Sequence, residues 1–204
     1  MKEFWNARYQ EKTYAYGKNP NVYFKQTIDK LKPGKLLLPA EGEGRNAVYA
    51  ARLGWEVYAY DFSENAHKKA MALAAENKVS LNYSLCSLED LTYPEGFFDA
   101  IGLIYVHFPD SIRSQNHQQL AAMLKNNGTL ILEGFSTEHP HYQKINPRVG
   151  GPKMLAQLYN TDKLRKDFVN FEFETLIEEE VELNEGQYHV GRTKVIRLLA
   201  RKRL

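Results

Sequence analysis

Residues 35–63 read KLLLPAEGEGRNAVYAARLGWEVYAYDFS, in which two apolar runs flank an alanine-rich segment. The first apolar run, 35–39, predicts a strand, and the second, 55–60, predicts another. Between them, residues 44–53 predict a helix that Gly54 ends. This strand, helix and strand form the repeating unit of a parallel sheet with crossover helices.

The loop between the first strand and the helix carries two glycines where a ligand can approach the backbone. Gly42 and Gly44 lack the Cβ atoms that keep backbone away from a ligand, and the helix that starts near Arg45 offers unpaired N–H groups there. Asp61 ends the second strand, where its carboxylate can accept hydrogen bonds from both hydroxyls of a ribose. These residues predict a site for a nucleotide-type cofactor.

The glycine pattern by itself leaves the cofactor open. Gly42, Gly44 and Ala47 satisfy the G-x-G-x-x-A form of the dinucleotide fingerprint. Asp61 lies close to the ~20-residue spacing expected for the acid that binds the ribose. A nicotinamide dinucleotide therefore fits the loop as one alternative.

Strands and helices continue to alternate along most of the chain, and the end breaks this order. Apolar runs predict further strands, and amphipathic runs predict helices, one of them capped by Ser63. The strands are expected at 81–85, 98–105 and 129–134, and the helices at 21–31, 63–78 and 111–125. Two long strands, 171–183 and 193–201, then follow with a turn around Gly186 that is too short for a crossover helix, so they must pair antiparallel. The predicted fold is α/β: a Rossmann-like, doubly wound, mostly parallel seven-stranded sheet with a C-terminal antiparallel hairpin.

Several motifs, in their order along the chain, resemble those of class I S-adenosylmethionine-dependent methyltransferases, in particular the tellurite-resistance and thiopurine methyltransferase group. They are FWNARYQ and YAYGKNPN near the N-terminus, EGEGRN at 41–46, FFDAIGLIYVHFP at 97–109, NGTLILEGF at 127–135, GGPKMLAQLY at 150–159 and EGQYHVG at 185–191. The resemblance implies S-adenosylmethionine as the cofactor. This cofactor agrees with the terminal antiparallel hairpin, because the sheets of dinucleotide dehydrogenases usually continue with parallel strands.

The resemblance implies that the glycine loop holds the aminocarboxyl part of the cofactor. Many relatives have an Asp in the first strand and another glycine before the loop, where this chain has Leu38 and Ala40. Glu41 must then supply the carboxylate near the cofactor ammonium group, beside Gly42 and Gly44.

Further cofactor contacts are expected after the next strands. Asp61 would bind the ribose, and the alternative is that it only caps the following helix. Arg45 and Asn46 are further candidates, which either reach the cofactor carboxylate or only tie the loop down. Phe62 is expected against the adenine, and Ser87 and Leu88 near the adenine edge. Ser87 could instead be an ordinary helix cap.

The acceptor side is expected after the fourth strand, where the activated methyl group faces in this fold. Tyr105 follows that strand among the cofactor contacts, and His107 is the candidate on the substrate side, with a hydrogen-bonded loop histidine as the alternative. Arg113 could attract an anionic substrate, or it could be an ordinary solvated helix arginine. Tyr16 is expected to act as a lid over the cofactor. His117 is expected on the helix surface.

Bulk properties limit the partners. With 27 basic and 25 acidic side chains among 204 residues, the formal charge of +2 gives no reason to expect a polyanion, and no nucleic-acid methyltransferase motif is present. We expect a single domain over 1–204, with a lid segment and helix at 1–34 and the core at 35–204. No apolar run reaches the ~20 residues that span a bilayer, so a cytoplasmic protein is expected.

A metal site is not expected. Cys86 is the only cysteine, which excludes an intrachain disulfide and a cysteine cluster for zinc. His139, His141 and His189 form no metal-ligand pattern with nearby acids.

The sequence therefore favours an S-adenosylmethionine-dependent methyltransferase that acts on a small-molecule nucleophile, such as a chalcogen oxyanion or a thiol, by in-line transfer. Oxyanions and thiolates present a lone pair without losing a proton, which fits the lack of an obvious catalytic pair. Two alternatives remain: a non-catalytic module that binds S-adenosylmethionine, and a nicotinamide-dependent oxidoreductase.

Overall fold

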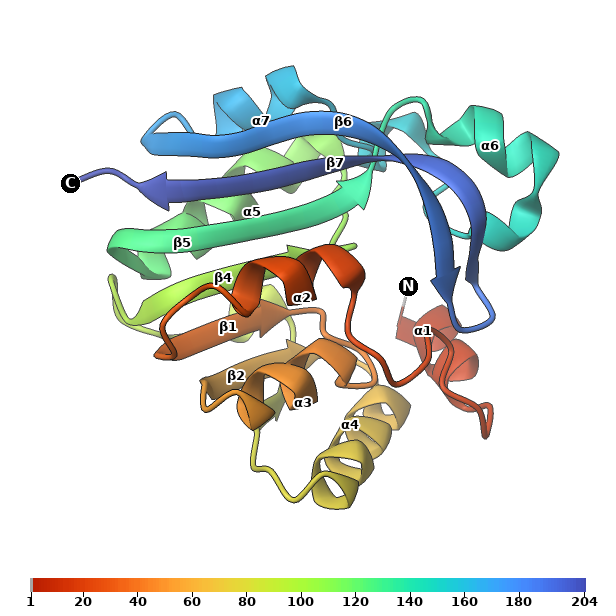
Figure 1. Ribbon diagram of the computed structural model, residues 1–204, viewed down its shortest axis with the longest axis horizontal. Helices are drawn as coiled ribbons and strands as arrows, with labels where there is room; N and C mark the ends of the chain where they lie inside the picture. Colours follow the sequence, from red (N-terminus) through yellow and green to blue (C-terminus); the bar gives the residue numbers. More distant parts are fainter. Residues whose placement is uncertain (1) are drawn as a thin grey trace.

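The computed structural model describes residues 2–204, and its centre is one seven-stranded sheet (Figure 1). The strand order is β3-β2-β1-β4-β5-β7-β6. The strands are β1 (Lys35–Pro39), β2 (Glu56–Asp61), β3 (Asn82–Leu85), β4 (Phe98–Ile104), β5 (Leu124–Phe135), β6 (Phe171–Glu185) and β7 (His189–Lys202). The helices are α1 (Lys2–Tyr9), α2 (Val22–Ile28), α3 (Arg45–Arg52), α4 (Glu64–Glu76), α5 (Asp110–Met123), α6 (His139–Ile145) and α7 (Thr161–Asp167).

The pairing of the strands confirms the predicted fold class. β1 pairs in parallel with β2 and β4, and the outer strands β3 and β5 continue this direction. β7 is antiparallel to both of its neighbours, β5 and β6. The order of the strands reverses between β1 and β4, so a ligand site is expected at the carboxyl ends of these two strands.

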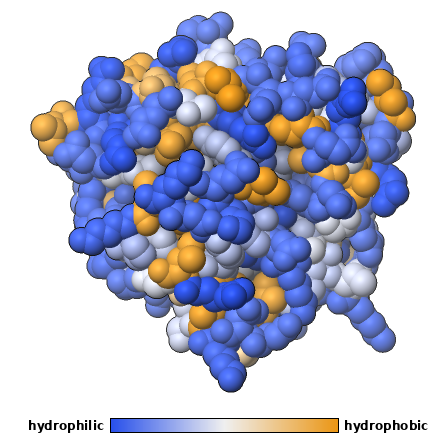
Figure 2. Space-filling view, viewed as in Figure 1, coloured by the Kyte–Doolittle hydropathy of each residue, from blue (hydrophilic) through white to orange (hydrophobic). Residues whose placement is uncertain are grey.

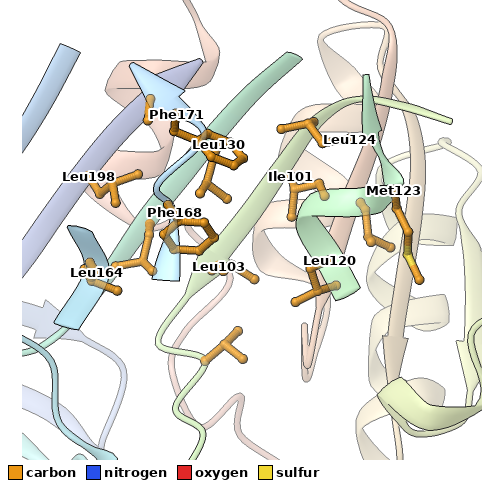
Figure 3. Packing of buried hydrophobic residues seen from close by; sticks show 14 of the residues in the cluster. Ile101, Leu103, Leu120, Met123, Leu124, Leu130, Leu164, Phe168, Phe171 and Leu198 are labelled. Carbon is orange, nitrogen blue, oxygen red and sulfur yellow. The ribbon is translucent and has the colours of Figure 1, made fainter. Parts of the chain in front are cut away.

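Alternation along the strands sends buried side chains to both faces of the sheet. In β1, Leu36 and Leu38 pack under α2 and α3, whereas Leu37 points into the opposite cluster. That second cluster lies between the sheet and α5 with α7, and Figure 3 shows Ile101, Leu103 and their neighbours within it. Both faces of the central strands are therefore buried, as in other doubly wound sheets.

The predicted helix at 21–31 begins where expected and ends early. Asn21 caps α2 by accepting a hydrogen bond from the N–H of Phe24. The helices α6 and α7 were not predicted. Each has only seven residues, which is too short for a helical period to stand out in the sequence.

Figure 2 shows that one face of the molecule is mostly hydrophilic, with hydrophobic residues in small separate groups. Within residues 2–204, no helix combines the length and the apolar character needed to cross a membrane.

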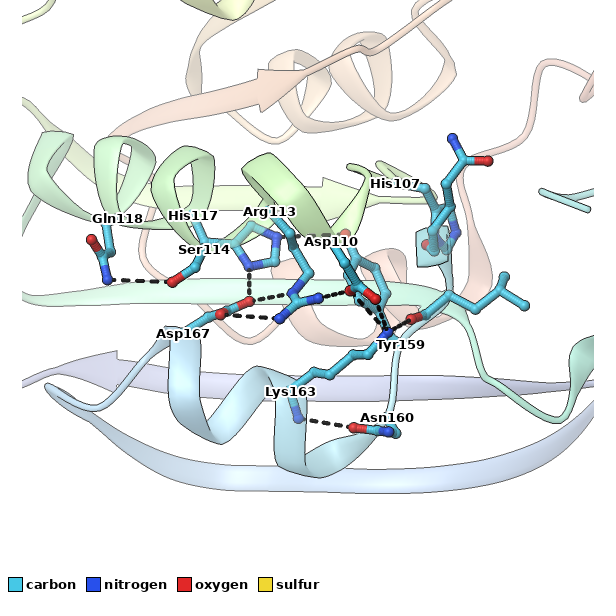
Figure 4. Close-up of polar contacts among 12 residues, drawn as sticks. His107, Asp110, Arg113, Ser114, His117, Gln118, Tyr159, Asn160, Lys163 and Asp167 are labelled. Atoms are coloured by element: carbon cyan, nitrogen blue, oxygen red, sulfur yellow. Dashed lines mark hydrogen bonds and ion pairs between the residues drawn. The ribbon is translucent and has the colours of Figure 1, made fainter. Parts of the chain in front are cut away.

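The expectation that His117 lies on the helix surface is wrong, because α7 covers this side of α5. His117 has no exposed surface, and its Nδ1 lies 2.8 Å from Asp167 Oδ2. Arg113 Nε donates to the same oxygen at 2.7 Å. Figure 4 shows both side chains of α5 directed at Asp167 at the end of α7. The contact joins residues about fifty positions apart, and so a local helical pattern could not indicate it.

We expect Asp167→Ala to lower the free energy of unfolding by about 3 kcal/mol, because it leaves Arg113 and His117 in a buried position without their shared carboxylate. Burial acts to raise the pKa of Asp167, but His117 and Arg113 outweigh it and the pKa is lowered. The stabilisation is therefore present above the ordinary pKa of an aspartate and is lost as the pH falls through the lower folded value. Urea unfolding at pH 7 measures the difference.

The matched control is Asp162→Asn in the exposed first turn of α7, which should change stability by less than about 1 kcal/mol. Equal effects of the two substitutions would contradict this account of Asp167.

Candidate functional site

The loop after β1 has a left-handed backbone at several positions. Ala40 has φ of 47°, and Gly42 and Gly44 have φ of 64° and 85°. Only glycine adopts this region without strain, so the two glycines are required by the path of the chain. Gly44 is the residue before α3, and the loop therefore turns the backbone directly into the N-terminus of that helix.

Glu41 ties the loop to the helix. Its Oε1 accepts hydrogen bonds from the N–H groups of Asn46 and Ala47, each at 2.8 Å, and its Oε2 lies 3.4 Å from the amide nitrogen of Asn46. Burial raises the pKa of Glu41 to about 7, although these N–H groups act in the opposite direction. Glu41 is thus a half-buried carboxyl whose charge is poised near neutral pH.

Asp61 connects the end of β2 to the same loop. Its Oδ2 accepts from the N–H of Gly42 at 3.1 Å, and its Oδ1 accepts from the N–H of Ser63 at 2.9 Å. Ser63 is itself the residue that caps α4, because its side chain accepts from Ala66 N. Asp61 is therefore not merely the helix cap, and burial raises its pKa. Phe62 follows it and is half-buried.

Two tyrosines contact the glycine loop. Tyr83 Oη donates to the carbonyl oxygen of Gly42 at 2.6 Å. A Cβ placed on Gly42 would come within 2.8 Å of the hydroxyl of Tyr9, which is only 6% exposed. Tyr9 ends α1, and its ring stacks on Trp5. The N-terminal helix consequently covers the loop (Figure 1).

The residues expected near an adenine lie beside Asp61. The N–H of Cys86 donates to the carbonyl of Asp61, which brings the end of β3 to this edge. Both the N–H and the hydroxyl of Ser87 donate to Asp90, so Ser87 caps its own short turn. Leu88 is buried at the start of that turn.

An aromatic group lies over the carboxyl ends of β4 and β5. Tyr105 follows β4 with φ of 56°, a strained conformation for a non-glycine residue and one that is common at functional sites. Its ring contacts Phe135 and His189, with centroids 4.8 and 4.5 Å away. Tyr16 lies on His189 from the N-terminal side, with centroids 4.4 Å apart. The structure thus brings Tyr16 and Tyr105 together near the glycine loop.

His107 and Arg113 use their polar atoms in structural contacts. The Nδ1 of His107 lies 2.8 Å from the carbonyl oxygen of Gln157, and its Nε2 accepts from the N–H of Phe135. Burial lowers the pKa of His107 to about 3. Both ring nitrogens are engaged with backbone, which corresponds to the alternative of a loop histidine. Arg113 pairs with Asp167 and Asp110 and is held between α5 and α7 (Figure 4).

A buried polar network joins the glycine loop to the sheet. Arg45 donates from Nη2 to Glu185 at 2.9 Å and from Nη1 to the carbonyl of Tyr16 at 3.3 Å. The amide of Asn21 reaches both Glu185 and Glu133. Arg45 therefore ties down the surrounding structure, which is one of the two roles expected for it, and Asn46 does so through Glu41.

Sequence reasoning missed Asn21, Glu133, Glu185 and His189. Each comes from a different element or turn, and a single charged residue in an amphipathic strand carries no signal of burial. EGQYHVG, at 185–191, is one of the motifs of the resemblance, but its pattern does not indicate contacts with Arg45. Among residues 2–204, no group of three or more His, Cys, Asp or Glu side chains is arranged to hold a metal ion.

Comparisons with known proteins agree with this fold. Residues 39–128 match the methyltransferase domain family. A structure described for the conversion of a disulfide bond into a thioacetal group during echinomycin biosynthesis has a TM-score of 0.79 at 18% identity, covering 100% of this chain and 92% of its own. An S-adenosylmethionine-dependent methyltransferase from Methanosarcina mazei has a TM-score of 0.72 at 15% identity, covering 91% of this chain and 99% of its own.

TehB from Haemophilus influenzae has a TM-score of 0.71 at 17% identity, covering 99% of this chain and 67% of its own. At these identities the likeness shows the fold. No curated protein matches the chain in sequence. The matches do not favour a nicotinamide-dependent oxidoreductase.

The raised pKa of Glu41 predicts how stability depends on pH. A carboxyl whose folded pKa exceeds its unfolded value favours folding when protonated, so stability falls as the pH rises from about 4.5 to about 7. We expect Glu41→Gln, which keeps an acceptor for Asn46 and Ala47, to remove this fall and to be more stable than wild type above pH 7, by up to ~3 kcal/mol. Urea unfolding at pH 5, 6 and 8 measures it.

The control is Glu64→Gln on the exposed surface of α4, which should leave the pH dependence unchanged. The same fall in stability between pH 5 and pH 8 in Glu41→Gln as in wild type would show that Glu41 does not titrate in this range.

Proposed function

We propose that the chain is a class I methyltransferase whose cofactor is S-adenosylmethionine, and that it transfers the methyl group to a small-molecule nucleophile. The observation that carries this proposal is the enclosed aromatic group beside the glycine loop. Phe135 and His189 in it are buried, and Tyr16 and Tyr105 are half-buried. An acceptor that binds against these four closely packed rings would be compact.

The cofactor fits the residues around the loop. Gly42 and Gly44 give the loop its left-handed path. Glu41 would meet the ammonium group of the cofactor, and Asp61 would accept from its ribose in addition to the two N–H groups that it already accepts. The cofactor supplies an electrophilic methyl group on a sulfonium. Tyr9 lies against Gly42, so α1 must move to admit the cofactor and can then exclude water from the site.

The protein contributes mainly orientation. Alignment of an acceptor with the methyl group can lower a barrier by up to ~7–11 kcal/mol in favourable cases. Tyr16 and Tyr105 are the residues we assign to the acceptor side. His107 and Arg113 are withdrawn from it, because each already spends its polar atoms on a structural contact.

We propose a chalcogen oxyanion or a thiol as the acceptor class. The motifs shared with the tellurite-resistance group and the structural likeness to TehB support it. The order of the strands and the final hairpin are also those expected from that resemblance.

We expect Asp61→Asn to weaken the binding of S-adenosylmethionine more than ~10-fold, because hydrogen bonds to an ionised carboxylate contribute about 1.5–3 kcal/mol each. The amide keeps an oxygen for the N–H of Gly42 or Ser63, so the loop is disturbed less than by alanine. Isothermal titration calorimetry of the purified variant gives the affinity, and Glu64→Ala on α4 is the control. Unchanged affinity would place the ribose elsewhere.

A panel of acceptors tests the function itself. Wild-type protein and radiolabelled S-adenosylmethionine should methylate a small thiol, selenite or tellurite, and Tyr16→Ala should lower turnover more than it lowers cofactor affinity, because Tyr16 lies over the acceptor side. Label confined to a macromolecule would contradict the proposal. Cofactor binding with no methylation of any acceptor would instead favour the non-catalytic module.

A further inference from the structure

Three histidines surround Phe135 at the end of β5. The ring centroids of His139, His189 and His107 lie 4.0, 5.2 and 5.8 Å from that of Phe135. His107 spends both nitrogens on Gln157 and Phe135, as described above. His139 does the same, with Nδ1 at 2.6 Å from Thr193 Oγ1 and Nε2 at 2.9 Å from the carbonyl of Gly150.

His189 differs from the other two. Its Nδ1 lies 3.1 Å from Glu185 Oε2, whereas its Nε2 has no hydrogen-bond partner among residues 2–204. The fully buried side-chain polar atoms without a partner, within the same residues, are Tyr23 Oη and Trp55 Nε1. His189 Nε2 is not one of them, so it reaches accessible surface although the residue is only 4% exposed.

Glu185 fixes the state of the His189 ring. The two residues face each other across the β6–β7 hairpin, and Arg45 Nη2 holds the same carboxylate oxygen at 2.9 Å. Burial acts to raise the pKa of Glu185, but Arg45 and His189 outweigh it and the pKa is about 2. An ionised carboxylate accepts only, so Nδ1 of His189 carries the proton and Nε2 carries the lone pair.

The His189 ring itself lies on the side that we assign to the acceptor. Tyr16 lies on His189 from the N-terminal segment and Tyr105 from the end of β4. Arg45, which bonds to the carboxylate behind the ring, opens the helix that follows the glycine loop. The ring is thus the member of the aromatic group that is connected, through Glu185 and Arg45, to the helix after the glycine loop.

We propose that His189 is the general base of the reaction, with Glu185 as its positioning residue, and that the acceptor enters with a proton on its nucleophilic atom. The inference rests on the proposed function. His189 Nε2 takes the proton from the acceptor hydroxyl or thiol, whose electron pair forms the bond to the methyl carbon. The carbon–sulfur bond of the sulfonium breaks, its pair stays on sulfur as a thioether, and the imidazolium then releases its proton to water.

The surroundings keep the free ring neutral, as a base must be. Burial is the largest cause that lowers the pKa of His189, and Arg45 and Arg8 lower it further, whereas Glu185 raises it. The other titratable groups around the ring are Tyr16, Tyr105, His107 and His139. The net shift is downward, so Nε2 is available at neutral pH.

Nitrogen-15 NMR of histidine-labelled protein without cofactor tests the state of the ring. We expect His189 to show an unprotonated Nε2 and a protonated Nδ1 from pH 6 to pH 8, and Glu185→Gln to mix the two tautomers. A protonated Nε2 in this pH range would overturn the base assignment, whatever the activity of the protein.

Kinetics tests the role in transfer. With a phenol or an alkyl thiol as acceptor, His189→Gln should lower kcat by about 100-fold or more. Calorimetry should show cofactor affinity within about threefold of wild type. The methylation rate of His189→Gln should recover as the pH approaches the pKa of the acceptor, because the acceptor then ionises without a base. Selenite or tellurite, which need no proton removed, should react at similar rates in both proteins.

The matched control is His141→Gln on the exposed surface of α6, which should leave every rate unchanged. Unfolding midpoints of both variants show whether they fold. A wild-type rate for phenol and thiol in folded His189→Gln overturns the base role alone. No methylation of any acceptor by wild type would instead remove the proposed function, and the base role with it.

Discussion

The hydrogen bond from the N–H of Gly42 to Asp61 is the contact on which the site depends. It joins the loop after β1 to the end of β2, and Tyr83 from β3 holds the carbonyl of the same glycine. Residues of β2 and β3 therefore hold both the N–H and the carbonyl of Gly42, in the loop after β1. The left-handed path of the loop then directs α3 away from the sheet edge with its N-terminal N–H groups facing the loop.

A second constraint lies on the acceptor side, where charged groups are buried together. Arg197 donates to Glu133 at 2.6 Å, and Asn21 connects Glu133 to Glu185, which Arg45 holds in turn. Burying such groups has a large desolvation cost that their mutual attraction offsets only with good geometry. The network consequently has few alternative arrangements, and it fixes the hairpin, the N-terminal segment and α3 relative to one another.

The two constraints meet at Arg45. Its side chain leaves the helix that follows the cofactor loop and ends on the carboxylate that orients His189. The proposed cofactor side and the proposed acceptor side are thus coupled through one guanidinium. This coupling explains why Arg45 is buried although it stands at the start of a short helix, where an arginine is normally solvated.

The strands could be predicted from the sequence because their signals are local. Apolar runs of four to eight residues and the turn at Gly186 identify the sheet and its terminal hairpin without any tertiary information. Gly42, Gly44 and Asp61 were also identifiable, because backbone conformation and position at a strand end are properties of short segments. The short helices α6 and α7 were missed because seven residues contain only two turns.

The sequence by itself thus determined the α/β class, the seven strands and the glycine loop with its acid. The tertiary structure alone decided which polar residues are buried and what they face. His117 was expected on the surface and is buried under α7, whereas His189 carried no signal and has a free nitrogen beside two tyrosines. The physical reason is that burial and hydrogen-bond partners arise from contacts between residues 50 to 170 positions apart, such as Asn21 with Glu185, and no pattern within one element encodes them.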